Sequence, residues 1–441
     1  MVDEVSNTNR LNINWTRGDM RRMRILIGGL SAIVLAGCGG TAGAGSTLAV
    51  GAFNPFSGRD ASFGPEMMGG CAPAVSLVNQ AGGVLGHKIS CQAVDTRGDP
   101  ADAVPAATKM IATTTNLVGV LGPSADEADA TVPVLNSAKI PMFADTGEAA
   151  FDHSKYTYFY RLTPADDVKG YALAEWAHQR GYTRAAAVFG NDTGAQSDVP
   201  TVLKGFKALG GTITINQSIA LDQSSYRTEV NQMLAGNPQV IFTEADPQTA
   251  ATYLSEVKQL HGMIPVIATE TSLQAPWLKA VRGAIGTADL AKYVIGMEPL
   301  APTTGAAWKV FNNSLLASGK SVPNPSQWST DPYSMTYYDG VNLMALAMLA
   351  ANSTSPSVYQ PKVVAVAQAS PGAVVVDSFA QGKQALASGK KIQYVGAIGP
   401  IIFDQWHNAS GAYEAASSVN GTNVKILGTV SAAQIAKLKG G

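Results

Sequence analysis

Clusters of basic residues are missing from this 441-residue chain, and charged residues of either sign make up only 14% of it. The 31 Lys and Arg nearly balance the 32 Asp and Glu, so the formal net charge is −1. Because nucleic-acid binding needs grouped Lys and Arg against the phosphates, we expect no nucleic-acid partner. The chain also lacks the G-x-S-x-G, H-E-x-x-H and G-x-x-x-x-G-K-[ST] motifs, and its five histidines are scattered. We therefore expect no enzyme, no cofactor and no metal site.

Apolar runs long enough to cross a membrane are missing too, because a spanning helix needs about 20 apolar residues. The longest run of this kind, residues 25–35, follows three arginines between residues 21 and 24. A basic start, a short apolar core and small residues at its end are typical of a secretory signal peptide. We therefore predict that residues 1–37 are a signal peptide. Acidic residues near the start of this segment reduce the positive charge that a signal peptide needs there. Three translation starts therefore stay open: Met1, Met20 and Met23.

Cysteine is rare, with three residues in the whole chain. Cys38 ends the sequence Leu-Ala-Gly-Cys directly behind the apolar run, and this tetrapeptide resembles the lipobox of bacterial lipoproteins. The resemblance implies that Cys38 is lipidated and anchors the protein on the extracytoplasmic side of a bacterial membrane, at the cell surface or in the periplasm. In the alternative interpretation, Cys38 is a small residue that closes the apolar segment. Residues 38–46, rich in Gly and Ala, are predicted to form a flexible tether.

Cys71 and Cys91 remain as an even pair in an oxidising compartment, where disulfides persist. Cys71 falls in a predicted helix and Cys91 in the predicted strand that follows, so the two elements can pack side by side. We predict a disulfide between them. The alternative is two buried free thiols, which behave as small apolar side chains.

Short apolar runs alternate with predicted helices after residue 47. The pattern predicts strands at residues 48–53, 88–95, 117–121, 141–143, 184–189, 212–219, 240–242 and 265–268, and helices at residues 66–80, 101–113, 126–137, 167–180, 195–208, 226–235 and 248–260. Runs rich in Val and Ile suit strands that are buried on both faces of a parallel sheet. One open sheet rarely holds so many strands, so the pattern predicts two α/β lobes with a ligand cleft beyond the strand ends.

Several short motifs recur in a defined order along the chain. They are residues 53–58 (FNPFSG), 79–89 (NQAGGVLGHKI), 95–100 (DTRGDP), 122–124 (GPS), 140–141 (IP), 189–194 (FGNDTG) and 399–404 (GPIIFD). The ordered set resembles the branched-chain amino-acid (leucine/isoleucine/valine) binding proteins, which are type I periplasmic solute-binding proteins of ABC transporters. The resemblance covers essentially all of residues 47–430.

This resemblance implies two doubly wound α/β lobes with a central ligand cleft and a hinge that the chain crosses several times. We expect lobe 1 to comprise residues 47–163 plus 299–404, and lobe 2 residues 164–298 plus 405–441. Proteins of this family capture a small solute between closing lobes and deliver it to an ABC permease with separate ATPase subunits. The expected ligand is a small polar solute, an amino acid or a related amide or amine, and the expected state is a monomer.

The family's contacts to a bound amino acid are carried over to this sequence by motif. Either Ser124 or Ala125 takes the position that binds the ligand carboxylate, because the loop after residue 121 is about one residue shorter than usual. Gly147 matches the backbone carbonyl that receives the ammonium group. Glu270 matches the second-lobe glutamate that receives the same group, and its alternative role is an acid at the start of a helix.

Two further pairs of positions shape the implied pocket. Phe63 and Tyr333 take the places of aromatic side chains that cover the ligand, and the alternative for both is ordinary core packing. Thr193 and Ala245 stand where the family often carries larger aromatic side chains, so the resemblance implies an enlarged pocket.

Glu148 departs from the family pattern, because it replaces a threonine whose hydroxyl binds the ligand carboxylate. A carboxylate at this position would repel a carboxylate ligand, unless Glu148 is exposed to solvent instead. Glu148 and Glu270 together favour the hypothesis of a ligand that carries positive charge.

Other proteins share parts of this pattern. A sensory binding module of the same fold differs only in its partner, so the sequence leaves that alternative open. A sugar-responsive repressor with similar lobes is disfavoured by the export signal and by the missing basic DNA-binding segment. An enzyme is disfavoured by the missing catalytic motifs.

Overall fold

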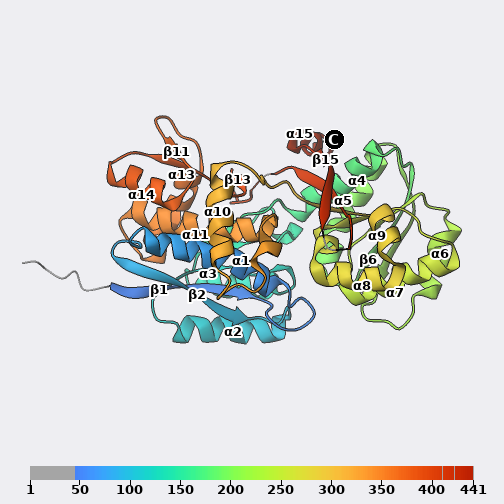
Figure 1. Cartoon of the computed structure of the whole chain (residues 1–441), viewed down its shortest axis with the longest axis horizontal. Helices are drawn as coiled ribbons and strands as arrows, with labels where there is room; N and C mark the ends of the chain where they lie inside the picture. Colours follow the sequence, from blue (N-terminus) through green and yellow to red (C-terminus); the bar gives the residue numbers. More distant parts are fainter. Residues whose placement is uncertain (1–44, 410, 422, 441) are drawn as a thin grey trace, which may run out of the picture. The chain divides into compact units, whose positions relative to one another are not determined.

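The computed structural model describes residues 45–409, 411–421 and 423–440 (Figure 1). The predicted signal peptide and the predicted lipidation site at Cys38 lie outside these residues. The strands are β1 (Gly45–Asn54), β2 (His87–Asp95), β3 (Leu117–Leu121), β4 (Met142–Ala144), β5 (Phe159–Arg161), β6 (Arg184–Gly190), β7 (Thr212–Ile219), β8 (Val240–Thr243), β9 (Val266–Thr269), β10 (Val294–Pro299), β11 (Val374–Val376), β12 (Ile392–Gly396), β13 (Gly399–Pro400), β14 (Tyr413–Ser418) and β15 (Val424–Val430).

The helices of the described residues alternate with these strands over the first two thirds of the chain. They are α1 (Phe63–Gln80), α2 (Pro100–Thr113), α3 (Ala125–Ser137), α4 (Asp166–Gln179), α5 (Thr193–Ala208), α6 (Arg227–Ala235), α7 (Pro247–Leu260), α8 (Ala275–Ile285), α9 (Thr287–Tyr293), α10 (Ala306–Ala317), α11 (Pro332–Ala351), α12 (Pro356–Tyr359), α13 (Val363–Ala367), α14 (Phe379–Ala387) and α15 (Ala432–Lys439), with short 3-10 turns at Ala149–Phe151, Glu270–Leu273, Pro325–Trp328 and Gln360–Lys362. None of these helices is both long enough and apolar enough to cross a membrane.

The first sheet consists of five parallel strands in the order β2-β1-β3-β4-β5. Helices cover both of its faces: α1 and α11 pack on one and α2 on the other (Figure 1). Helix α3 shares its apolar core with α2. This double cover explains why the strands read as nearly continuous apolar runs, since both sets of alternating side chains are buried.

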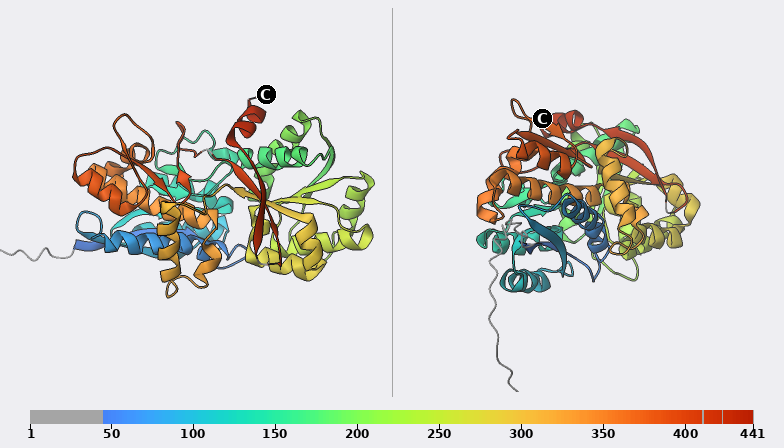
Figure 2. Two further views of the ribbon diagram at one scale, coloured as in Figure 1. Left: turned by 45° about the horizontal axis from the view of Figure 1, so that its top comes forward. Right: turned by 60° about the vertical axis from the view of Figure 1, so that its left-hand side comes forward.

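The second sheet has seven strands in the order β15-β14-β10-β9-β8-β6-β7. The strands from β10 to β7 are parallel, whereas β14 is antiparallel to both of its neighbours. Helices α4 and α5 pack on one face, and α6, α7 and α8 on the other. The C-terminal helix α15 lies against α4 (Figure 2).

The chain passes between the two sheets more than once, as predicted. It enters the second sheet after β5, leaves it after β10 and returns to it at β14. The segment between these last two strands adds α10 to α14 and a small sheet, β11-β12-β13, to the first lobe's core.

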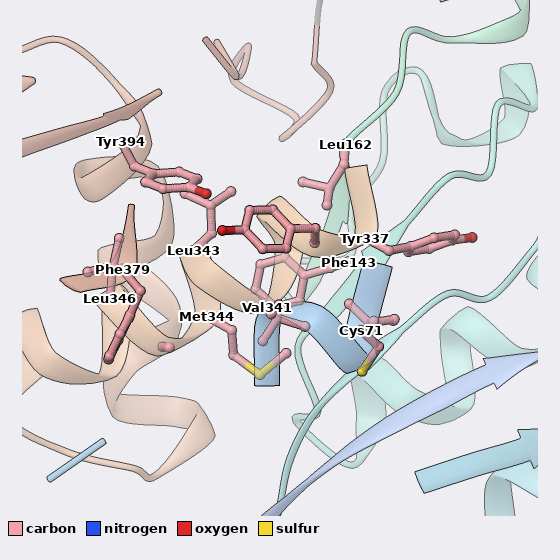
Figure 3. Close-up of a cluster of buried hydrophobic side chains, with 14 of the residues drawn as sticks. Cys71, Phe143, Leu162, Tyr337, Val341, Leu343, Met344, Leu346, Phe379 and Tyr394 are labelled. Carbon is pink, nitrogen blue, oxygen red and sulfur yellow. The ribbon is translucent and has the colours of Figure 1, made fainter. Parts of the chain in front are cut away.

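Helix α11 forms the centre of that core. Tyr337, Val341 and Met344 lie among apolar side chains from β4, α1 and the small sheet, and all three are at most 1% exposed (Figure 3). Cys71 of α1 belongs to the same core and is bonded to Cys91 of β2. The predicted disulfide is therefore confirmed, and it ties α1 to the sheet that it covers.

The predicted strands and helices up to residue 268 are all present, with ends that differ by no more than a few residues. Local capping accounts for several of these ends. Asp99 accepts the Ala101 N–H and Pro100 occupies the first position of α2, while Asp246 and Pro247 begin α7 in the same way.

Candidate functional site

Loops at the carboxyl ends of the parallel strands line a cavity of about 280 Å³. Loops after β1, β3 and β4 of the first sheet contribute to it, as do loops after β6, β8 and β9 of the second sheet. Parallel strands expose their carboxyl ends at one edge, which is where open α/β sheets bind ligands. The cavity is therefore the candidate site.

Seven of the nine predicted ligand positions line this cavity. They are Phe63, Ser124, Ala125, Gly147, Ala245, Glu270 and Tyr333. The structure thus brings residues together from three loops of the first sheet, two loops of the second sheet and α11.

Thr193 and Glu148 do not line the cavity. Thr193 is exposed at the start of α5, and its neighbour Gly194 lines the cavity instead. Glu148 is only 3% exposed, so it faces neither the cavity nor solvent, and neither carboxylate oxygen has a hydrogen-bond partner. Burial raises the pKa of Glu148 well above its usual value, and the nearby charge of Asp166 raises it further.

Ser124 is already hydrogen-bonded within its own loop. Its hydroxyl donates to Glu127 Oε1 at 2.8 Å. Burial raises the pKa of Glu127 to about 7, although the hydrogen bond from Ser124 opposes that shift. The single hydroxyl proton of Ser124 is therefore used at the start of α3.

Gly147 lies against the first turn of α4. Its carbonyl accepts the backbone N–H of Asp166 at 2.7 Å. A Cβ at this position would overlap the Asp166 carboxylate, so the close approach of the loop to α4 requires glycine.

A buried lysine, which the sequence reasoning did not single out, dominates the second-sheet side. Lys169 Nζ lies 3.2 Å from Asp166 Oδ1, 3.3 Å from Asp198 Oδ2, 3.5 Å from Glu244 Oε2 and 3.2 Å from Glu270 Oε1. We call these five residues the Lys169 cluster. Lys169, Asp166, Glu244 and Glu270 line the cavity, and Asp198 lies behind them.

Burial and mutual attraction oppose each other in the Lys169 cluster, and burial prevails at Asp166 and Glu270, whose pKa values are raised. Burial disfavours the Lys169 ammonium, but the four carboxylates outweigh burial and raise its pKa well above the usual value. Burial raises the pKa of Asp198 well above its usual range. Burial also opposes ionisation of Glu244, but Lys169 and its neighbours lower the Glu244 pKa overall. The predicted ammonium acceptor, Glu270, therefore already binds an ammonium of the chain itself.

Acidic side chains also gather where the loops of the two sheets approach each other. Burial raises the pKa of Asp60 to about 7, and the charges of Asp126 and Asp192 contribute to the shift. Asp126 accepts the backbone N–H of Gly194 at 3.3 Å, which joins the start of α3 to the start of α5. Arg59 forms a 2.8 Å ion pair with Asp222, a pair that we call the Arg59 pair.

Aromatic side chains complete the lining. Phe63 and Tyr333 are joined by Trp277 and Tyr413, which the sequence analysis did not predict. Trp277 donates its indole N–H to the Ala245 carbonyl at 3.1 Å. The small side chain of Ala245 therefore lies beside a large one, and Trp277 supplies the aromatic wall that the sequence lacks at residue 245.

Among the described residues, no group of three or more His, Cys, Asp or Glu side chains has the arrangement that would hold a metal ion. The carboxylates of Asp166, Glu244 and Glu270 do converge, but on the Lys169 ammonium, which occupies that position.

Comparison with known proteins identifies a family and several similar proteins. A family model described as periplasmic binding protein matches residues 47–422. The Leu/Ile/Val-binding protein homolog 3 of Brucella melitensis is 32% identical over 83 residues, which make up 19% of this chain and 23% of that protein. The alignment thus spans less than a quarter of this relative.

Two solved structures share the fold at low sequence identity. The branched-chain amino acid binding protein LivJ of Streptococcus pneumoniae, in complex with isoleucine, has a TM-score of 0.70 at 17% identity, with 87% of this chain and 99% of that chain covered. A solute-binding protein of an ABC transporter from Rhodopseudomonas palustris HaA2, in complex with p-hydroxybenzoic acid, has a TM-score of 0.69 at 19% identity, with 88% and 97% covered.

Proposed function

This chain belongs to the periplasmic binding protein family, and from that premise we propose that it captures a small polar solute between two closing lobes and delivers it to an ABC permease. The family is one of binding proteins, not of enzymes, and it implies an extracytoplasmic location. The observation that carries the proposal is the cavity, since both sheets contribute the loops at their carboxyl ends to its wall.

The proposed lobes are residues 47–163 plus 299–404 and residues 164–298 plus 405–441. Phe63, Ser124, Ala125, Gly147 and Tyr333 of lobe 1 would then meet the ligand from one side, with Ala245 and Glu270 of lobe 2 opposite. A ligand that contacts both lobes favours the closed arrangement, because only that arrangement offers both sets of contacts.

The capture step is tested by a thermal-shift screen of the purified protein against amino acids, amides, amines, aromatic acids and sugars. A ligand at 100 times its Kd stabilises the folded protein by about 2.7 kcal/mol, which raises the Tm by several degrees. A Trp277→Phe variant should lose part of any ligand-induced change in tryptophan fluorescence. A screen in which no solute raises the Tm would count against capture of a small solute.

We also propose that the protein is anchored to the membrane through a lipid on Cys38. Mass spectrometry of the mature N-terminal peptide should show an acylated cysteine, and C38S should release the protein into the soluble fraction. An unmodified N-terminus that begins elsewhere would contradict the anchor but would leave solute capture untouched.

A further inference from the structure

Side-chain donors in the cavity wall are largely engaged by the protein itself. Ser124 donates to Glu127, Trp277 donates to the Ala245 carbonyl, and Ser62 donates to Gln274 Oε1 at 3.1 Å. Both basic side chains of the wall, Arg59 and Lys169, are held in ion pairs. Apart from the hydroxyls of Tyr333 and Tyr413, a ligand carboxylate therefore finds few free side-chain donors in the described wall.

Several hydrogen-bond acceptors of the cavity wall, in contrast, have no partner. Among the described residues, Glu66 Oε1, Asp145 Oδ1 and Glu270 Oε2 are buried without a hydrogen-bond partner, and all three residues line the cavity. Glu66 is only 2% exposed, so water reaches it poorly. A buried acceptor without a partner costs about 1–3 kcal/mol, and a ligand that donates N–H groups would remove this cost.

Acidic side chains also predominate in the cavity wall. Within the described residues, its carboxyl groups outnumber its basic groups by ten to two: Asp60, Glu66, Asp126, Glu127, Asp145, Asp166, Asp192, Glu244, Asp246 and Glu270 against Arg59 and Lys169. Burial and neighbouring carboxylates raise the pKa of Glu66, Asp166 and Glu270, so these positions already disfavour further negative charge. An anionic ligand would therefore meet like charges at short range.

Building on the proposed function, we infer that the ligand is a small organic cation with amine, amidine or guanidine N–H groups and no carboxylate. The hypothesis of a cationic ligand thus keeps only one of the two residues that first suggested it. Glu148 lies outside the cavity, and Glu270 takes part through its unpartnered Oε2. Among the described residues no group of carboxylates is arranged to hold a metal ion, which favours an organic cation.

Matched ligand series test this inference by titration calorimetry on the purified protein. One series keeps the aromatic shape and varies the charge, with benzamidine, benzamide and benzoate. The other keeps an aliphatic shape, with isoamylamine, leucine and 4-methylpentanoate. In each series we expect the cation to bind at least 10-fold more tightly than its neutral, zwitterionic or anionic counterparts.

Variants then locate the cation. E66Q and E270Q should each weaken binding of the tighter cation by about 10-fold, because each replaces a carboxyl group with an amide. D102N serves as the matched control, since Asp102 is an exposed acid on α2 that pairs with Arg97 outside the cavity. Melting temperatures measured in parallel separate lost binding from lost folding.

The outcomes distinguish the inference from the function on which it rests. Tighter binding of benzoate, leucine or 4-methylpentanoate than of the matched cation would overturn the cationic class and leave solute capture standing. If E66Q and E270Q bound the cation as tightly as D102N does, the assignment of the cation to Glu66 and Glu270 would be overturned as well. Failure of every cation, zwitterion, anion and sugar to bind would count against both.

Discussion

The Lys169 cluster and the Arg59 pair lie on the same cavity but differ in their surroundings. The Arg59 pair is the shorter contact, at 2.8 Å, yet its side chains are 44% and 52% exposed. The Lys169 side chain is 6% exposed and has four acidic partners between 3.2 and 3.5 Å. Water and salt screen the first interaction, whereas the second must compensate for lost hydration on every member. Burial, not distance, should therefore decide how much each contributes.

Removal of the Lys169 ammonium would give the largest effect. We expect K169M to lower the free energy of unfolding by about 3–5 kcal/mol, because four buried carboxylates lose their only cation in the cluster. Denaturant unfolding measures the change. K109M, at an exposed position of α2, is the control and should stay within about 0.5 kcal/mol of the parent. A similar small change for K169M would show that burial does not distinguish the two regions.

The pH dependence of stability should distinguish Asp60 and Asp192, which lie outside the Lys169 cluster, from the cluster itself. Burial raises the pKa of Asp60 to about 7 and the pKa of Asp192 to about 6, so the folded protein binds these protons more tightly than the unfolded chain. Unfolding free energy must therefore fall as pH rises from 5 to 8. The charged groups that act on Asp60 are Asp126, Asp192, Asp246 and Arg59, and D60N should flatten part of the curve.

Cation affinity should follow the opposite trend over the same range. Protons and a cationic ligand compete for these carboxylates, so affinity should rise as pH increases. Calorimetry in two buffers with different ionisation heats would count the protons released on binding. Proton uptake, or an affinity that falls with rising pH, would contradict this expectation.

The first-sheet side offers a smaller test. S124A removes the hydroxyl that donates to Glu127, which should cost about 1 kcal/mol of stability. Because Glu127 uses the hydroxyl proton, S124A should weaken cation binding much less than E66Q does. S76A on α1 is a suitable control, because the Ser76 hydroxyl accepts a hydrogen bond from the exposed Gln80 side chain, away from the cavity. A large loss of affinity without lost stability would instead mean that the Ser124 hydroxyl hydrogen-bonds to the ligand and not to Glu127.

The smallest effect is expected at the Arg59 pair. R59A should change the free energy of unfolding by no more than about 1 kcal/mol, and the difference should shrink in 0.5 M salt. Salt-dependent unfolding of the parent and variant would measure it. A larger, salt-resistant loss would indicate that exposed contacts between the two sheets stabilise the protein as strongly as the buried cluster does.

Much of the fold could be predicted from the sequence. The spacing of apolar residues and the positions of glycine, aspartate and proline predicted the helices and strands up to residue 268. The family resemblance predicted the two-lobed fold that LivJ shares. The later segment could not be placed from its pattern. Helix α11 is buried around most of its circumference, so its sequence from Met335 to Met348 shows no polar face.

The site was harder to predict because its interactions depend on tertiary structure. Asp166 and Lys169 share one helical turn, but Asp198, Glu244 and Glu270 come from α5 and from the ends of β8 and β9. No sequence spacing relates these positions. The loop around Gly147 shows the same difficulty, because its sequence does not reveal that Glu148 turns away from the cavity.

Gly147 also limits how related sequences can diverge. Its lack of a side chain leaves room for the Asp166 carboxylate, and its carbonyl receives the Asp166 N–H. We expect a lineage that acquires a larger residue at 147 to shorten the side chain at 166 as well. Loss of the Asp166 carboxylate would remove a partner of Lys169, so positions 147, 166 and 169 should covary as a block. Ligand preference in such lineages would then change in one coordinated step instead of by gradual drift.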